Sequence, residues 1–201
     1  MTTEPHPNLA RPAFLAACVV LAVGCTSGLP DAPPNPAARP GALLSGVLCG
    51  DAVLTKPGGA VADRMVVTSR GAASGGGLVL DQTIRSADGE TATRRWVVRP
   101  DGPDTYRGTL TGDEAVAASG AVRARVAGDA LRIRYPVAGV PFGRMEQVLT
   151  LRADGTIGNA GTVRVLGVPV RRLTEVIRPQ PGVDLDAPAP CSAPTPSETA
   201  P

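Results

Sequence analysis

The chain has 201 residues, 24 of them glycine and 21 proline, with 20 basic and 18 acidic residues and a formal net charge of +2. This near balance argues against a nucleic-acid-binding protein, and an aromatic content of 2% is too low for platforms on which bases or sugars stack. The single histidine is His6, in a segment that we expect to be removed, which excludes Ser-His and Cys-His catalysis and His-ligated metal sites from the mature protein.

An apolar stretch near the N-terminus has the length of an export signal. Residues 13–23, AFLAACVVLAV, are uncharged and follow Arg11. A helix that spans a bilayer needs about 20 apolar residues, whereas the apolar core of a signal peptide has roughly 7–15. We therefore expect residues 1–24 to be a signal peptide.

This stretch ends in Leu21-Ala22-Val23-Gly24-Cys25, which resembles the bacterial lipobox. The resemblance implies a lipid on the Cys25 sulfur and cleavage after Gly24, and several acyl chains give stable membrane anchoring. One alternative is a box that ends at Cys18, although it leaves only about five apolar residues upstream. The other is an ordinary cleaved signal with an incidental Cys25. Thr26 favours the outer over the inner membrane if the organism is Gram-negative, with the protein facing the periplasm.

Two proline-rich segments flank the middle of the chain. Residues 25–44 begin with the lipidated cysteine and continue as TSGLPDAPPNPAARPG, which lacks large apolar side chains almost completely. Such a stretch is typical of a stiff, extended spacer. Residues 179–201 have a similar composition, from which we expect a disordered tail.

Between these segments, residues 45–178 carry the pattern of an antiparallel β-domain. Turn signals such as Asp88-Gly89, Gly128-Asp129 and Asp154-Gly155 recur, mostly about every 11–17 residues. Apolar and polar residues alternate between the turns, as in Leu131-Arg132-Ile133-Arg134-Tyr135. The pattern predicts about ten strands, which start near Gly46, Val61, Leu78, Thr91, Thr105, Ala115, Ala130, Gly143, Thr156 and Val168.

An open sheet of ten strands would expose long edges, and closure removes them. We therefore expect an all-β fold, a single antiparallel meander that closes into a lipocalin-like β-barrel. A β-sandwich is the alternative.

An ordered set of motifs in this domain resembles domain-of-unknown-function family 3833, a family of uncharacterised bacterial lipoproteins. The resemblance covers roughly residues 45–178 and implies a link to membrane lipids. Its motifs are Leu80-Asp81, Asp88-Gly89-Glu90, Arg94-Arg95-Trp96, Tyr106-Arg107-Gly108-Thr109 and Gly128-Asp129-Ala130-Leu131 with Tyr135. Two positions and one four-residue segment depart from the family pattern. Gln82 stands where the family has glutamate, Ser86 replaces an aromatic residue, and Glu146-Gln147-Val148-Leu149 replaces Asp-Asp-Trp-Met.

Four residues are candidates for a ligand site inside the barrel. Arg94 and Trp96 lie two residues apart on one face of a strand, so Trp96 is expected to line an apolar cavity while Arg94 binds a carboxylate or phosphate. The alternative is a tryptophan that closes one end of the barrel, with the arginine packed on its ring. Tyr106 and Tyr135 are expected to add hydroxyl groups, or else to be core residues with the hydroxyl at the rim.

Cys49 and Cys191 are the thiols that remain after processing, apart from Cys25. Export permits a disulfide between them, which would tie the tail to the first strand. A buried Cys49 with a mobile, unpaired Cys191 is equally compatible with the sequence.

The preferred function is that of a membrane-anchored protein that binds a fatty acid or another apolar or amphipathic lipid, without catalysis, cofactor or metal. A closed sheet of this size can hold one small ligand. A structural or interaction lipoprotein with a filled barrel is the second hypothesis. The third is a histidine-free enzyme that acts on lipid intermediates through tyrosine, arginine or carboxylate groups.

Overall fold

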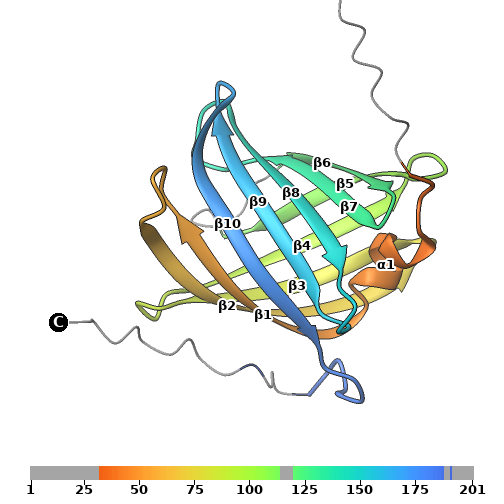
Figure 1. Ribbon diagram of the computed structural model, residues 1–201. Coiled ribbons are helices and arrows are strands. Elements are labelled where there is room, and N and C mark those ends of the chain that lie inside the picture. The colour runs from red at the N-terminus through yellow and green to blue at the C-terminus, as the bar shows by residue number, and fades with distance from the viewer. Residues whose placement is uncertain (1–31, 114–119, 188–190, 192–201) are drawn as a thin grey trace, which may run out of the picture. The chain divides into compact units, whose positions relative to one another are not determined.

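The computed structural model describes residues 32–113, 120–187 and 191 of the chain. Ten antiparallel strands form a closed barrel in which each strand pairs with its neighbours in sequence and β10 pairs with β1 (Figure 1). The strands are β1 (Gly46–Thr55), β2 (Val61–Ser74), β3 (Gly77–Ser86), β4 (Thr91–Pro100), β5 (Thr105–Gly112), β6 (Gly120–Ala127), β7 (Ala130–Pro136), β8 (Gly143–Leu151), β9 (Ile157–Val165) and β10 (Val168–Pro179).

The predicted meander and its closure are confirmed, and the alternative sandwich is excluded. Nine strands begin within one residue of the expected position. The expected start of the remaining strand, near Ala115, lies outside the described residues, and β6 is described from Gly120 onward.

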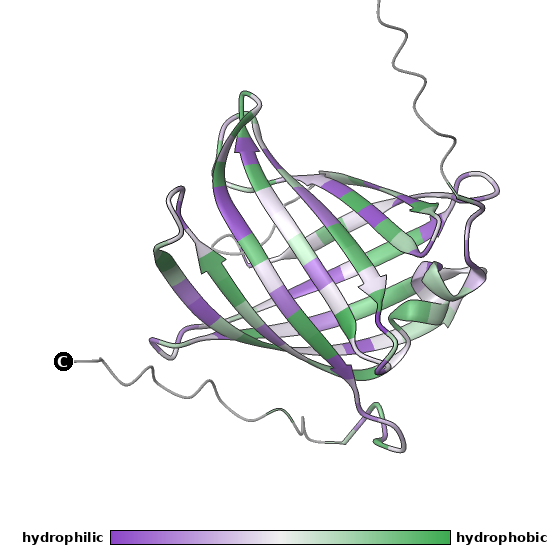
Figure 2. Ribbon diagram, viewed as in Figure 1, coloured by the Kyte–Doolittle hydropathy of each residue, from purple (hydrophilic) through white to green (hydrophobic). Residues whose placement is uncertain are grey.

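Alternation of apolar and polar residues separates the inside of the barrel from the outside. On β7, Leu131, Ile133 and Tyr135 are buried, whereas Arg132 and Arg134 are exposed. Successive side chains on a strand point to opposite faces, so this pattern places one set of residues in the core. Figure 2 shows the same alternation along the strands around the barrel.

A short helical segment, which we call the plug, closes one end of the barrel, and we call this end the plug end. The plug consists of a 3-10 turn η1 (Pro36–Ala38), the helix α1 (Pro40–Leu43) and its C-cap Leu44, with a proline in the first turn of each helical element. Proline is favoured there because its ring fixes φ near the helical value and the missing N–H would have no helical partner. Ala38, Leu43 and Leu44 are buried in the core.

The plug packs closely on the barrel wall. A Cβ atom on Gly71 of β2 would lie 1.8 Å from the carbonyl oxygen of Leu44, so only glycine allows this approach. Asn35 N–H also donates a hydrogen bond to Gly128 O in the β6–β7 turn. The second half of the segment that we expected to be a spacer is therefore part of the fold, because its few apolar side chains fill the barrel mouth.

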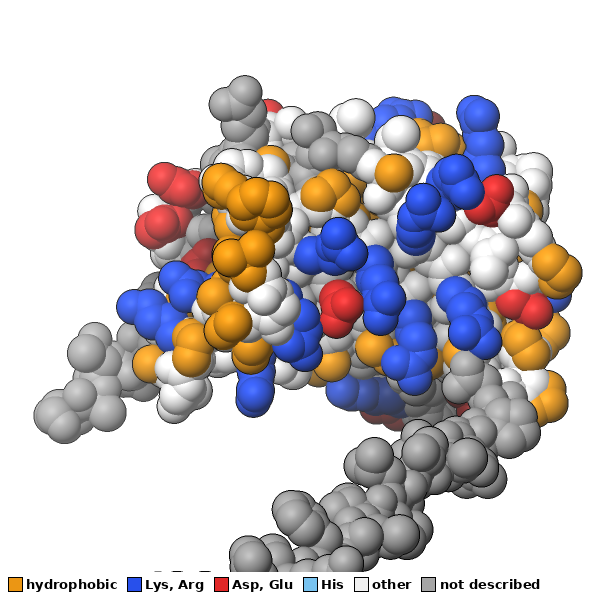
Figure 3. All heavy atoms as spheres, turned by 90° about the horizontal axis from the view of Figure 1, so that it is seen from above, with side chains coloured by type: hydrophobic (Ala, Val, Ile, Leu, Met, Phe, Trp, Pro, Cys, Tyr) orange, Lys and Arg blue, Asp and Glu red, His pale blue; other side chains and the backbone are white. Residues whose placement is uncertain are grey.

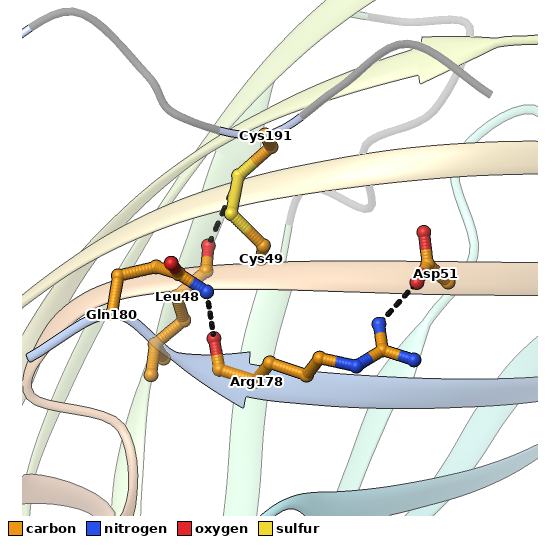
Figure 4. Close-up of polar contacts among 6 residues, drawn as sticks. All are labelled: Leu48, Cys49, Asp51, Arg178, Gln180 and Cys191. Carbon is orange, nitrogen blue, oxygen red and sulfur yellow. Dashed lines mark hydrogen bonds and ion pairs between the residues drawn. A yellow bond between two sulfur atoms is a disulfide. The ribbon is translucent and has the colours of Figure 1, made fainter.

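The chain after β10 crosses the outer face of β1 and β2. The N–H of Gln180 donates to Val47 O, and the Arg70 guanidinium donates to the carbonyl oxygens of Leu185 and Ala187 at 2.7 Å each. A disulfide joins Cys49 of β1 to Cys191 (Figure 4). We call residues 180–187 together with Cys191 the strap.

Val47 and Thr68 point outward and lie directly opposite Arg70 and Cys49, the two residues that hold the strap, and both are buried. Residues 180–187 thus differ from the disordered tail expected from their composition. The disulfide, one of two states that the sequence left open, is present.

The described residues belong to one compact unit, which contains every core residue that the structure describes. The expected signal peptide and the lipidation site at Cys25 lie outside the described residues. Within the described part of the chain, no helix is both long enough and apolar enough to cross a membrane.

Candidate functional site: a polar belt inside the barrel

Six polar side chains line a cavity inside the barrel whose other walls are apolar. They come from six strands, and together we call them the polar belt: Ser69, Gln82, Arg94, Gln147, Asn159 and Glu175. The strand register places Ser69 opposite Gln82 and Gln82 opposite Arg94, while Asn159 lies opposite Glu175. The belt therefore consists of two directly paired groups together with Gln147.

Gln82 orients the first group. Its Oε1 accepts hydrogen bonds from Arg94 Nε at 2.6 Å and from Trp96 Nε1 at 2.7 Å, and its Nε2 donates to Ser69 Oγ at 2.8 Å. The Arg94 guanidinium carbon lies 5.3 Å from the centre of the Trp96 ring, within the range of a cation–π contact. Arg94 is thus fixed through Nε and its π-face.

Glu175 dominates the second group. It is buried, and its Oε2 accepts a hydrogen bond from Asn159 Nδ2 at 2.8 Å. A Cβ on Gly50 would lie 2.1 Å from Glu175 Oε1, so the glycine leaves the room that this carboxyl occupies. Burial raises the pKa of Glu175 above its ordinary value of 4.5, and the hydrogen bond from Asn159 and the charge of Arg94 oppose this rise.

The belt forms one wall of a small cavity. The cavity has a volume of about 40 Å³, and its other walls are apolar side chains that reach to Pro40 and Leu44 of the plug. This is room for roughly three water molecules, since one water needs about 10–15 Å³ on this measure. Asn159 Oδ1 is buried on this wall and accepts no hydrogen bond from the described residues.

The two predicted tyrosines lie in different places. Tyr135 is buried behind Trp96, with the ring centres 5.0 Å apart in an edge-to-face arrangement. Burial raises the pKa of its hydroxyl above 10.0, opposed by the charge of Arg94 and by hydrogen bonding to it. Tyr106 is also a buried core residue, but its pKa, raised mainly by burial, responds to Arg39 and Asp104 rather than to the belt.

The structure therefore brings Arg94, Trp96 and Tyr135 together and leaves Tyr106 apart. Trp96 is 5% exposed and lines the cavity, as the ligand-site hypothesis predicts. Arg94 also packs on the Trp96 ring, as the alternative predicts.

Sequence reasoning missed most of the belt. In the segment from Leu78 to Arg85, Gln82 falls on the apolar face between Leu80 and Ile84. Glu175 likewise stands between Leu173 and Ile177, and Gln147 between Met145 and Leu149. A polar residue with an apolar residue two positions away on each side is the signal that would have identified these three.

The belt combines one cation and one carboxyl group with uncharged amide and hydroxyl groups. Arg94 is its permanent cation, and Glu175, its one carboxyl group, has a pKa that is raised by burial. The described residues contain no group of three or more His, Cys, Asp or Glu side chains that could hold a metal ion. Gln82 and Gln147 both belong to the departures from the family pattern noted above, so amides stand here where the pattern has acids.

Residues 19–178 match the model of a protein family, DUF3833, which is described as a protein of unknown function. The chain belongs to this family. The match starts before Cys25 and ends at Arg178, so it includes the whole barrel of this DUF3833 protein except Pro179, the last residue of β10.

Among solved structures, the DUF3833 barrel is similar to the crystal structure of Rv2717c from M. tuberculosis. The sequences are 18% identical, the alignment covers 68% of this chain and 92% of the other, and the TM-score is 0.49. No curated protein matches the sequence.

Proposed function

We propose that this DUF3833 protein is a lipoprotein of the cell envelope, anchored through Cys25, whose barrel binds an amphipathic molecule by its carboxylate or phosphate headgroup. Its role is binding rather than catalysis. The observation that carries the proposal is the Arg94 guanidinium, held inside the barrel by Gln82 and Trp96.

Arg94 has little to neutralise its charge. It makes no ion pair with any carboxylate that the structure describes, and the one carboxyl group in the belt, Glu175, is hydrogen-bonded to Asn159 instead. The Arg94 side chain is half-buried, and withdrawing a cation from water costs free energy unless an anion pairs with it. A bound carboxylate or phosphate supplies the pair, because the planar guanidinium fork matches two oxygens of either group.

The apolar part of the ligand needs more room than the cavity offers. About 40 Å³ does not hold an acyl chain, so side chains next to the belt must move. Met65, Met145 and Leu173 are the partly buried candidates. Methionine suits this role because its unbranched side chain adapts to irregular spaces.

The small cavity also favours a second candidate function, that of a structural or interaction lipoprotein with a filled barrel. In this case the belt stabilises the barrel and holds a few water molecules. The two candidates differ in whether the interior opens for an amphipathic molecule.

Calorimetric titration with decanoate, decyl phosphate and uncharged decanol tests the proposal. We expect one or both anions to bind far better than decanol, and the preferred anion identifies the headgroup. Arg94→Gln should weaken this binding about tenfold or more, since hydrogen bonds to charged groups contribute about 1.5–3 kcal/mol.

Arg95→Gln is the matched control. Arg95 is the next residue of β4, points outward and pairs with Asp81 at 3.2 Å. It should leave binding unchanged. No binding of either anion to the wild type, or equal losses in both variants, would reject the ligand proposal and favour the filled barrel.

The anchor has its own test, which uses labelling of cells with an alkyne analogue of palmitate. Label should enter the wild type and Cys18→Ala but not Cys25→Ala. Label retained in Cys25→Ala would refute anchoring at this residue.

A further inference from the structure

Large apolar side chains are exposed at the end of the barrel opposite the plug. Phe142, next to β8, is 79% exposed, and Leu166 and Val168, in and next to the β9–β10 turn, are 76% and 61% exposed. Val140, Phe142 and Leu166 line one surface hollow. We call Val140, Phe142, Leu166 and Val168 the rim patch.

The backbone at the rim patch is unfavourable for the residues that it carries. Leu166 and Phe142 have φ angles of 50° and 58°, and they are the only non-glycine residues with positive φ in the described chain. Such values favour glycine, asparagine or aspartate, and they are uncommon for bulky side chains. Apolar side chains therefore occupy positions where a polar residue would suit both the backbone and the solvent.

Two arginines lie beside this patch, and four more form a row across the outer wall. Arg144 and Arg164 line the same hollow as Leu166 and lie directly opposite each other in the β8–β9 register. A second row of arginines, each opposite the next, crosses four strands from β4 to β7 and consists of Arg99, Arg107, Arg123 and Arg134. We call these six arginines the basic face.

Few carboxylates compensate this charge. Glu146 pairs with Arg134 and Arg164 at 3.2 and 3.3 Å, and Asp101 pairs with Arg107 at 3.0 Å. Like charges directly opposite each other on a sheet are destabilising. Figure 3 shows hydrophobic side chains gathered beside a surface on which basic side chains clearly outnumber acidic ones.

We propose that the rim patch and the basic face dock on an anionic lipid surface. Apolar tips next to arginines fit the boundary between headgroups and acyl chains, because the tips enter the apolar layer while the arginines contact the phosphates. The interaction uses the outside of the barrel and is independent of any ligand bound inside it.

Vesicle co-sedimentation tests this proposal, with a chain that starts at Thr26, since the whole described core lies within residues 31–201. The vesicles contain either phosphatidylcholine alone or one part phosphatidylglycerol to two parts phosphatidylcholine. We expect binding to the anionic vesicles only, and weaker binding as salt is added, because salt screens exposed charges.

Leu166→Asn is the decisive variant, because asparagine accepts a positive φ and should keep or raise the melting temperature. It should weaken vesicle binding about tenfold, as expected when a largely buried leucine is lost from the lipid. Arg123→Gln should weaken binding without a loss of stability, because it relieves like-charge repulsion.

Leu151→Asn is the matched control, since Leu151 is an exposed leucine at the plug end of β8. It should bind as the wild type does. Equal binding to both kinds of vesicle, or a loss in Leu151→Asn as large as in Leu166→Asn, would overturn the proposal. So would a wild type that sediments as a dimer which Leu166→Asn dissociates, because the patch would then be an interface between two copies.

Discussion

Glu175 shows at the scale of one residue how the interior combines burial with polarity. Its carboxyl group is buried against Asn159, Gly50 leaves it room, and burial raises its pKa. A carboxyl group whose pKa is raised on folding binds its proton more tightly in the folded state than in the unfolded state. The stability that it contributes is therefore complete below pH 4.5 and is lost as the pH rises through the folded-state pKa.

Glu175→Gln should remove this dependence of stability on pH. The glutamine amide has the shape of the protonated carboxyl group and can also accept and donate hydrogen bonds, but it does not titrate. Urea unfolding of both proteins at a series of pH values measures the effect. We expect the free energy of unfolding of the wild type to fall relative to that of the variant as the pH rises above 4.5. Parallel pH profiles would show that Glu175 is ionised at no cost in the folded barrel.

At the scale of elements, the plug and the strap are both held by close contacts with the barrel wall. The plug depends on Gly71, where any side chain would collide with the backbone of Leu44. The strap depends on the Cys49–Cys191 disulfide and on Arg70. Each contact joins a proline-rich segment to a strand that is distant in sequence.

Gly71→Ala should therefore dislodge the plug. Overpacking of this kind costs about 1–3 kcal/mol of stability. We expect amide hydrogen exchange in α1 to be faster in the variant than in the wild type, and exchange in the strands to change less. Ala72→Val is the control, since Ala72 is the next residue of β2 and is exposed. Unchanged exchange in α1 of Gly71→Ala would contradict the predicted clash.

Cys191→Ser should release the strap. The disulfide closes a loop with a sequence separation of 142, so its loss should lower the free energy of unfolding by up to about 5 kcal/mol in the chain-entropy model. A reducing agent should destabilise the wild type to the same level and leave the variant unaffected. A wild type that is equally stable with and without the reducing agent would show that the bond contributes nothing.

At the scale of the whole molecule, the sequence predicts the barrel better than it predicts the contents. Period-two alternation and regular turns are local signals, and they locate the strands and separate Ile133 from Arg134. The belt depends on closure, which brings Gln82, Asn159 and Glu175 from separate strands into one interior. Composition alone misplaced Pro40 in a spacer, because a few apolar neighbours are enough to dock a short plug.

The central claim is that the barrel interior receives an anionic headgroup at Arg94. A crystal structure of the protein grown with the preferred probe, decanoate or decyl phosphate, tests it most directly. We expect the headgroup within hydrogen-bond distance of the Arg94 guanidinium and the alkyl chain between side chains that have moved from their present positions. A probe found only on the outer surface, with Arg94 still enclosed by Gln82 and Trp96, would contradict the claim.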